Sequence, residues 1–137
     1  EKVIELRQYL EKSNNKIIPV WHKNRGINEY KKMCKEYTGK IISIGGFRGT
    51  DIKDKQYLMF LKVAKEHDCK VHCLGMTRIK VLNKVPFYSV DSSTWKQSGN
   101  YGLYKKFTGE KFIIYNNKSK YKTTELDELN FKEFVKV

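Results

Sequence analysis

Short apolar runs alternate with amphipathic segments along the first hundred residues of the chain. The runs are rich in β-branched and aromatic residues, which is typical of buried strands, and they lie at residues 16–21, 41–44, 71–74 and 87–90. The segments before and between them carry apolar residues at helical spacing, as Val3, Leu6 and Leu10 do near the start. Helices that alternate with strands predict an α/β fold with a parallel sheet and right-handed crossovers. Four βα units correspond to half of a (β/α)8 TIM-type barrel.

Polar residues mark where the later helices of this part begin. Asn28 is a suitable helix cap, and either Asp51 or Asp54 suits the next helix. A short helix is expected around Arg78 to Leu82, directly before the last strand.

The last part of the chain has a different pattern. Two apolar segments flank Thr108-Gly109 and predict a hairpin, with strands at residues 101–106 and 111–115. A basic loop or strand at 118–122 and a helix at 130–137 complete this part. The chain is therefore expected to comprise a half-barrel of βα units at 1–100 and a small basic extension at 101–137.

The charge of the chain narrows its range of partners. Its 28 Lys and Arg exceed its 15 Asp and Glu, so the net charge is +13. Such an excess favours a polyanionic partner, most simply nucleic acid, whereas a solubilising lysine surface is the alternative explanation. Aromatic residues are abundant enough to stack on bases as well. The candidate nucleic-acid contacts are the lysines of the extension, Lys105, Lys106, Lys118, Lys120 and Lys122.

Cysteine content and hydropathy indicate a cytoplasmic protein without membrane contact. The three cysteines are an odd number without framework spacing, so free thiols are expected. No apolar run is long enough to span a bilayer, and no signal peptide is evident. The chain begins at Glu1 without a methionine, so a processed start and a cut from a longer protein both stay open.

Neither a metal nor a cofactor is expected. His67, Cys69, His72 and Cys73 are potential zinc ligands, but they straddle a helix end and a strand. His72 and Cys73 are neighbours in the strand and therefore point to opposite faces of the sheet.

The ends of three predicted strands carry the candidate chemistry. Gly45-Gly46 follows the second strand, Gly75 follows the third, and Asp91 follows the fourth. Small or reactive residues at the carboxyl ends of parallel strands are how such sheets build binding sites. The glycine pair suits either a close ligand or a tight turn. Asp91 suits either a structural cap or a nucleophile that forms a glycosyl-enzyme intermediate.

Together these strand ends resemble the tRNA-guanine transglycosylase superfamily, most closely its divergent phage-type members. The resemblance spans roughly Ile17 to Gly102 and rests on three segments in the same order, Ile44-Gly45-Gly46-Phe47, Val71 to Gly75 and Tyr88 to Trp95. It implies a (β/α)8 barrel that exchanges guanine in tRNA or DNA for a 7-deazaguanine base, the chemistry that leads to queuosine.

The resemblance also implies roles for individual residues. Asp91 would attack C1′ of the target nucleotide, and Gly45, Gly46 and Phe47 would line the base pocket. The strand that bears Cys73 and ends at Gly75 would form the floor of that pocket.

Several departures from the family leave open whether this chain is itself an enzyme. Cys73 stands where the family usually has glycine. Trp21 ends the strand where the family has a base-reading glutamine, and it suits either base stacking or core packing. The zinc site and the strands with the second catalytic aspartate are absent. The chain is thus expected to be the C-terminal part of a longer base-exchange enzyme, and a non-catalytic nucleic-acid-binding module is the alternative.

The predicted half-barrel has two unpaired edges, at residues 17–20 and 87–90. Unpaired strand edges are costly in water. We therefore expect the edges to be covered by the folded-back hairpin, by a homodimer, or by an N-terminal half-barrel partner.

Overall fold

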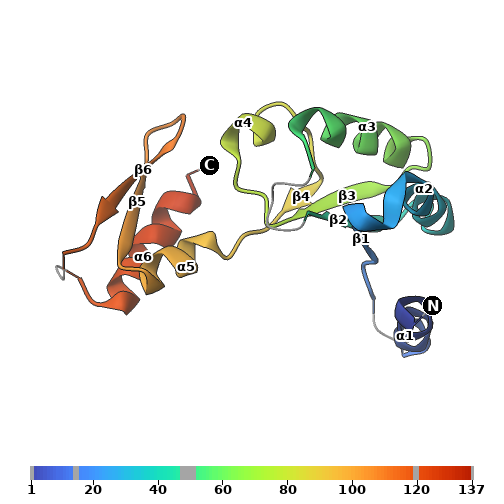
Figure 1. Ribbon diagram of the computed structural model, residues 1–137, viewed down its shortest axis with the longest axis horizontal. Coiled ribbons are helices and arrows are strands. Elements are labelled where there is room, and N and C mark those ends of the chain that lie inside the picture. Colours follow the sequence, from blue (N-terminus) through green and yellow to red (C-terminus); the bar gives the residue numbers. More distant parts are fainter. Residues whose placement is uncertain (1, 14–15, 47–51, 119–120, 137) are drawn as a thin grey trace. The chain divides into compact units, whose positions relative to one another are not determined.

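The computed structural model describes residues 2–13, 16–46, 52–118 and 121–136, and its chain divides into two compact units (Figure 1). The first unit comprises Glu1–Leu74 and Phe87–Val90, and the second comprises Gly75–Pro86 and Asp91–Val137. Phe47 and Lys120, both candidate site residues, lie outside the described residues.

The first unit is built on a parallel sheet with the strand order β1-β2-β3-β4. Its strands are β1 (Val20–His22), β2 (Ile41–Gly45), β3 (Lys70–Leu74) and β4 (Ser89–Val90). Its helices are α1 (Lys2–Lys12), α2 (Gly26–Glu36) and α3 (Asp54–Lys65), with a 3₁₀ turn at Lys23–Arg25. The prediction of an α/β fold with a four-stranded parallel sheet is confirmed. The sequence predicts the first strand over residues 16–21, but β1 comprises Val20–His22, so only the end of the expected edge segment at 17–20 pairs with β2.

One face of this sheet carries the core of the first unit. The register aligns Trp21 with Ile44 and Ile44 with Cys73, so their side chains share a face, and all three are buried. Helices α2 and α3 pack against this face, where Trp21 contacts the rings of Tyr30 and Phe60. The Tyr30 hydroxyl donates to the Phe60 carbonyl at 3.0 Å, which ties the two helices together.

The fourth strand differs from the prediction. A buried strand over residues 87–90 was expected, but β4 has only two residues, Ser89 and Val90, and both are exposed. It pairs with β3 alone, so no further strand among the described residues covers its outer side. Phe87 instead packs its ring edge-to-face on Tyr57 of α3, at 5.4 Å between ring centroids. Phe87 therefore contributes to packing ahead of β4 and does not extend the strand.

The second unit combines short helices with a hairpin. It contains α4 (Ile79–Leu82), α5 (Thr94–Asn100), the antiparallel strands β5 (Leu103–Phe107) and β6 (Phe112–Asn116), and α6 (Thr123–Phe134). The predicted hairpin and the short helix α4 are confirmed. Helix α5 was not predicted, and the last helix begins at Thr123 rather than at residue 130. The Glu125 carboxylate accepts the Lys122 backbone N–H at 2.9 Å, and this contact stabilises the earlier start.

Helix α6 closes one edge of the hairpin. The buried Asn130 amide accepts the Lys105 N–H at 2.8 Å and donates to the Leu103 carbonyl at 2.9 Å. Glu133 accepts the Phe107 N–H at 2.8 Å. These side chains take the place of a neighbouring strand, and the ring of Phe134 stacks on Phe112 beside them.

Across the described ranges, none of the helices combines the length and the hydropathy needed to cross a membrane.

Candidate functional site

Asp91 lies directly after β4 and is exposed. Its Oδ1 accepts a hydrogen bond of 2.7 Å from the backbone N–H of Gly75, the first residue after β3. Gly75 has a φ of +65°, in the left-handed region that favours glycine. The structure thus brings together two of the predicted site residues, and the backbone of one holds the carboxylate of the other.

The residues after Asp91 form a turn that begins α5. Ser92 Oγ accepts the Thr94 N–H at 3.0 Å and lies 2.8 Å from Thr94 Oγ1. The cap position of α5 is Ser93, two residues after Asp91. The hydrogen bond from Gly75 ties the Asp91 carboxylate to the turn that follows β3.

The glycine pair at the end of β2 has a different setting: Gly45 is the last residue of the strand and Gly46 follows it. Gly45 is buried, and a Cβ atom at this position would lie 3.0 Å from Cε1 and 3.1 Å from Nδ1 of His22. The group that approaches Gly45 closely is thus an imidazole from the neighbouring strand β1, which would have to shift to admit a side chain here. Gly46 is half-buried.

Trp21 and Cys73 belong to the core of the first unit. Trp21 is only 1% exposed, its ring lies between Tyr30 and Phe60, and its Nε1–H donates to the Gly26 carbonyl at 2.9 Å. Of the two roles that the sequence allowed for Trp21, core packing is the one observed. Cys73 is 2% exposed on the same face of the sheet.

The opposite face of the sheet carries polar residues that the sequence analysis did not assign. The register aligns Ser43 of β2 with His72 of β3, and His72 with Ser89 of β4. His72 Nδ1 lies 2.8 Å from Ser89 Oγ, within hydrogen-bond distance. Ser43 Oγ is buried and has no hydrogen-bond partner among the described residues. The period of two along each run would have predicted this shared polar face.

Two of the three buried cysteines lie close together, Cys34 in α2 and Cys69 immediately before β3. Cys69 Sγ donates to the carbonyls of Cys34 and Tyr37, at 3.3 and 3.2 Å. Burial raises the pKa of Cys34 to about 12 and also raises the pKa of Cys69. Both thiols are therefore protonated at neutral pH and are poor nucleophiles or ligands. In the part of the chain that the structure describes, no group of three or more His, Cys, Asp and Glu residues is placed to hold a metal ion.

The candidate lysines of the extension differ in their surroundings. Lys106, Lys118 and Lys122 are exposed. Lys105 is half-buried on β5, with its ammonium 5.7 Å from the centroid of the Phe134 ring, and burial lowers its pKa. Three of the predicted contacts are thus available to solvent.

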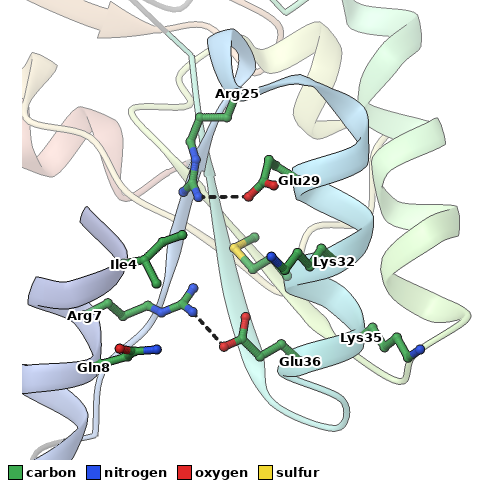
Figure 2. Close-up of a pocket in the computed structure, with 9 residues that line it drawn as sticks. Ile4, Arg7, Gln8, Arg25, Glu29, Lys32, Lys35 and Glu36 are labelled. Carbon is green, nitrogen blue, oxygen red and sulfur yellow. Dashed lines mark hydrogen bonds and ion pairs between the residues drawn. The ribbon is translucent and has the colours of Figure 1, made fainter. Parts of the chain in front are cut away.

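A cavity of about 500 Å³ lies between α1 and α2 (Figure 2). Its charged lining residues are four cations and two carboxylates, namely Arg7, Arg25, Lys32, Lys35, Glu29 and Glu36. The composition of the chain predicted an anionic partner, but nothing in the sequence marked this cavity, because it depends on how α1 packs.

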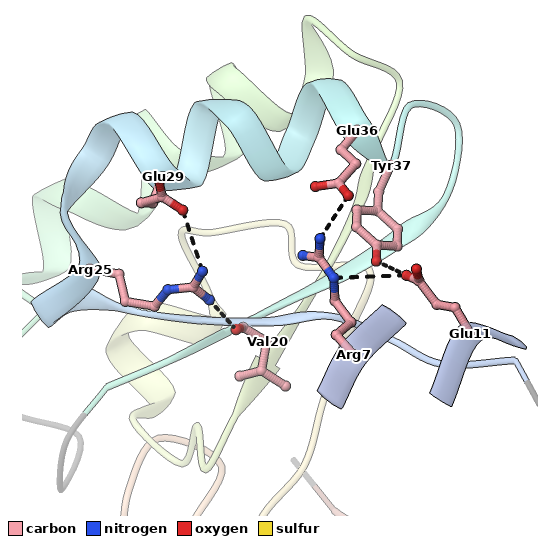
Figure 3. A network of polar contacts seen from close by, with 7 residues as sticks. All are labelled: Arg7, Glu11, Val20, Arg25, Glu29, Glu36 and Tyr37. Atoms are coloured by element: carbon pink, nitrogen blue, oxygen red, sulfur yellow. Dashed lines mark hydrogen bonds and ion pairs between the residues drawn. The ribbon is translucent and has the colours of Figure 1, made fainter. Parts of the chain in front are cut away.

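Ion pairs occupy both carboxylates of this cavity (Figure 3). Arg7 Nη2 lies 2.7 Å from Glu36 Oε1, and Arg25 Nη2 lies 3.4 Å from Glu29 Oε2. Arg25 also donates to the Val20 carbonyl on the outer edge of β1. Glu29 and Glu36 are therefore neutralised by arginines, whereas Lys32 and Lys35 are exposed on the same helix.

Comparisons with protein-family models, with curated proteins and with solved structures found no match for this chain.

Proposed function

We propose that this chain binds nucleic acid through the phosphate backbone. The observation that carries the proposal is the charge distribution on and beside α2. Both carboxylates of this helix are paired with arginines, and three exposed lysines, Lys31, Lys32 and Lys35, remain beside them. Lys32 and Lys35 also line the cavity beside α2, and a cluster of lysine charges attracts phosphates and releases counterions on binding.

Salt dependence tests this proposal directly. Fluorescence anisotropy with labelled duplex and single-stranded probes would measure affinity from about 50 mM to about 200 mM salt. Three phosphate contacts predict that duplex affinity falls roughly 40-fold over this range. Weak binding that does not change with salt would contradict a nucleic-acid role and favour a solubilising lysine surface.

Charge-neutral variants locate the surface. We expect the combined replacement of Lys31, Lys32 and Lys35 by glutamine to make the binding less sensitive to salt. The slope of log affinity against log salt concentration should become shallower by about 0.9 for each phosphate that a lysine no longer neutralises. A second triple variant, in which Lys106, Lys118 and Lys122 are replaced by glutamine, measures how much of the affinity comes from the extension.

The control replaces two lysines that are already engaged in ion pairs, so it removes two charges where the α2 variant removes three. Lys132 and Lys136 form ion pairs with Glu128 and Glu133, so their replacement by glutamine removes two charges without removing free cations. A loss of affinity as large in this control as in the α2 variant would point to net charge alone.

A second candidate function is base exchange through Asp91. Two observations support it: Asp91 is an exposed carboxylate at a strand end, held by Gly75, and the sheet order runs sequentially without reversal. Sequential order is the order of (β/α)8 barrels, whereas doubly wound sheets reverse direction. On this proposal the four parallel strands are half of such a barrel.

The resemblance to transglycosylases supplies the chemistry of this candidate. A carboxylate oxygen of Asp91 bonds to C1′ as the bond from C1′ to N9 of guanine breaks, and guanine leaves with a proton taken up at N9. The incoming 7-deazaguanine base, deprotonated at N9, then attacks C1′ and releases the carboxylate. Proton transfer requires an acid and a base, and the family's second aspartate has no counterpart in this sequence.

Intact-protein mass spectrometry after incubation with guanine-containing RNA or DNA separates the two functions. Base exchange predicts a covalent adduct in the native chain that Asp91→Asn abolishes while binding persists. An adduct that survives in Asp91→Asn would refute the role of Asp91. Salt-sensitive binding with no adduct in either protein would leave the binding function alone.

A further inference from the structure

The hairpin of the second unit presents one closed edge and one open edge. On the closed edge, Asn130 and Glu133 of α6 bond to the backbone of Leu103, Lys105 and Phe107. The polar backbone groups of these β5 residues therefore point away from β6. Because hydrogen-bonding direction alternates along an antiparallel strand, Tyr104 and Lys106 are the residues of β5 that bond to β6.

This alternation determines which groups of β6 are free of β5. Tyr104 aligns with Tyr115, and Lys106 aligns with Ile113. The bonds from Asn117 N–H to the Gly102 carbonyl and from Thr108 N–H to the Lys111 carbonyl follow the same alternation. The N–H and C=O groups of Phe112, Ile114 and Asn116 consequently point outward from the hairpin.

The outer edge of β6 lacks the features that usually prevent strand addition. Its five residues contain no charge and no proline, and their register against β5 has no bulge. Ile113, Ile114 and Tyr115 are 39%, 58% and 45% exposed. Within the described residues, β5 is the only strand that pairs with β6.

We infer that β6 is a self-association edge, on which a second copy of this chain adds its own β6 in antiparallel orientation. The register that uses all the outward groups of both strands places Ile114 opposite Ile114 of the partner subunit as a hydrogen-bonded pair. Phe112 then faces Asn116 of the partner subunit, and Ile113 faces Tyr115 of the partner subunit. The two hairpins become one four-stranded sheet joined by about six new backbone hydrogen bonds.

The residues of this strand favour a second copy over other occupants. The antiparallel pairing places isoleucine opposite isoleucine and isoleucine opposite tyrosine, both favourable cross-strand pairs. It also brings Glu110, before the strand, towards Lys118 of the partner subunit, whereas a parallel arrangement would align like charges. Lys105 and Lys106 lie on β5, one strand away from the seam, so neither faces a lysine of the other copy.

The total charge makes this association weak and gives it a distinctive salt response. Two copies that each carry +13 repel one another, and a seam of five residues is small for a stable dimer. Salt screens the repulsion, so dimerisation should strengthen as salt rises. Binding to a polyanion or to an acidic peptide should weaken instead, which separates this inference from the proposed function.

Sedimentation velocity over a concentration series, from about 10 μM to about 1 mM, tests the inference. The native chain should shift from monomer towards dimer with concentration, and more so at about 300 mM than at about 50 mM salt. At a concentration where about nine-tenths of the molecules are dimeric, the amides of Phe112, Ile114 and Asn116 should exchange about tenfold more slowly than in the monomer.

Substitutions at Ile114 identify the seam. Ile114→Pro removes an outward N–H without removing a bond to β5, so it should abolish dimerisation and leave the Tyr104 and Lys106 amides protected. Ile114→Val keeps the N–H and should dimerise normally. Ile114→Lys places two charges opposite each other and should also give a monomer, which serves as the second test if the proline variant unfolds.

A variant elsewhere distinguishes this seam from another exposed apolar surface, that of helix α1. Helix α1 exposes Val3, Leu6 and Leu10, and Leu6→Ser should leave dimerisation unchanged if β6 is the seam. A native chain that stays monomeric throughout the series would overturn the inference, even if it captures an acidic peptide. Full dimerisation of Ile114→Pro, or its loss in Leu6→Ser alone, would overturn it as well.

Discussion

Asn130 links helix α6 to the hairpin through its side-chain amide. It is fully buried, and its side-chain amide makes two hydrogen bonds to the backbone of β5, of 2.8 and 2.9 Å. Asn130→Ala removes both bonds and leaves the Lys105 N–H and the Leu103 carbonyl without partners. The removal of two bonds, each with the penalty of a partly buried orphan group, predicts a destabilisation of about 2–4 kcal/mol.

Urea unfolding followed by circular dichroism, together with hydrogen exchange at the Lys105 amide, measures this effect. Asn130→Asp sharpens the test, because a carboxylate accepts from Lys105 but presents an oxygen to the Leu103 carbonyl. This variant should be destabilised at neutral pH and should partly recover in acid, where the protonated carboxyl can donate. The recovery would show that the donor matters as much as the acceptor.

The control is Asn116→Ala on the exposed side of β6, which should change stability by no more than about 0.5 kcal/mol. A loss below about 1 kcal/mol for Asn130→Ala, with unchanged exchange at Lys105, would refute the role of Asn130 as a substitute for a strand.

Three further predictions concern other contacts. The hydrogen bonds from Lys136 and from the Phe107 N–H lower the pKa of Glu133 below 4.5, so its stabilisation is present above pH 4.5 and is lost as the pH falls through the lowered pKa. Urea midpoints measured against pH should show this loss, and Glu133→Gln should flatten the profile. Burial raises the pKa of Cys34 to about 12, so a thiol reagent at pH 8 should leave the folded chain unmodified at Cys34, and rapid labelling without unfolding would contradict this. Gly99→Ala would bring a Cβ atom into a clash with Asp127 Oδ1, so it should lower the free energy of unfolding in urea by about 1–3 kcal/mol. Adding Asp127→Ala should recover part of this loss, and an equal loss in the double variant would exclude the clash as its cause.

Local pattern was sufficient for the hairpin and for the alternation of strands and helices in the first unit. Runs such as Ile41–Ile44 alternate with amphipathic helices, and this order alone specified a parallel sheet, because parallel strands need crossover helices. Thr108-Gly109 between two apolar segments was enough to place the hairpin. These features depend on residues close together in the sequence, so periodicity and turn residues reveal them.

Elements that depend on distant partners were missed or misjudged. The segment at 87–90 is rich in strand-forming residues, but it ends the sheet, and only Ser89 and Val90 pair with β3. Helix α5 has a weak local signal, and it packs against α6, which lies more than twenty residues later. Local propensity cannot predict such elements, because their stability comes from contacts made after the chain has folded.

The candidate site shows the same division. The pattern of strands along the chain was enough to predict that Asp91 and Gly75 follow successive strands, and the large positive charge is a matter of composition. The hydrogen bond from Gly75 to the Asp91 carboxylate and the burial of Trp21 in the core exist only in the folded chain. Only the fold shows which carboxylates of α2 are neutralised and which edge of the hairpin stays open. Composition and periodicity are properties of the chain, whereas pairing and burial depend on which distant residues the fold brings within a few ångströms.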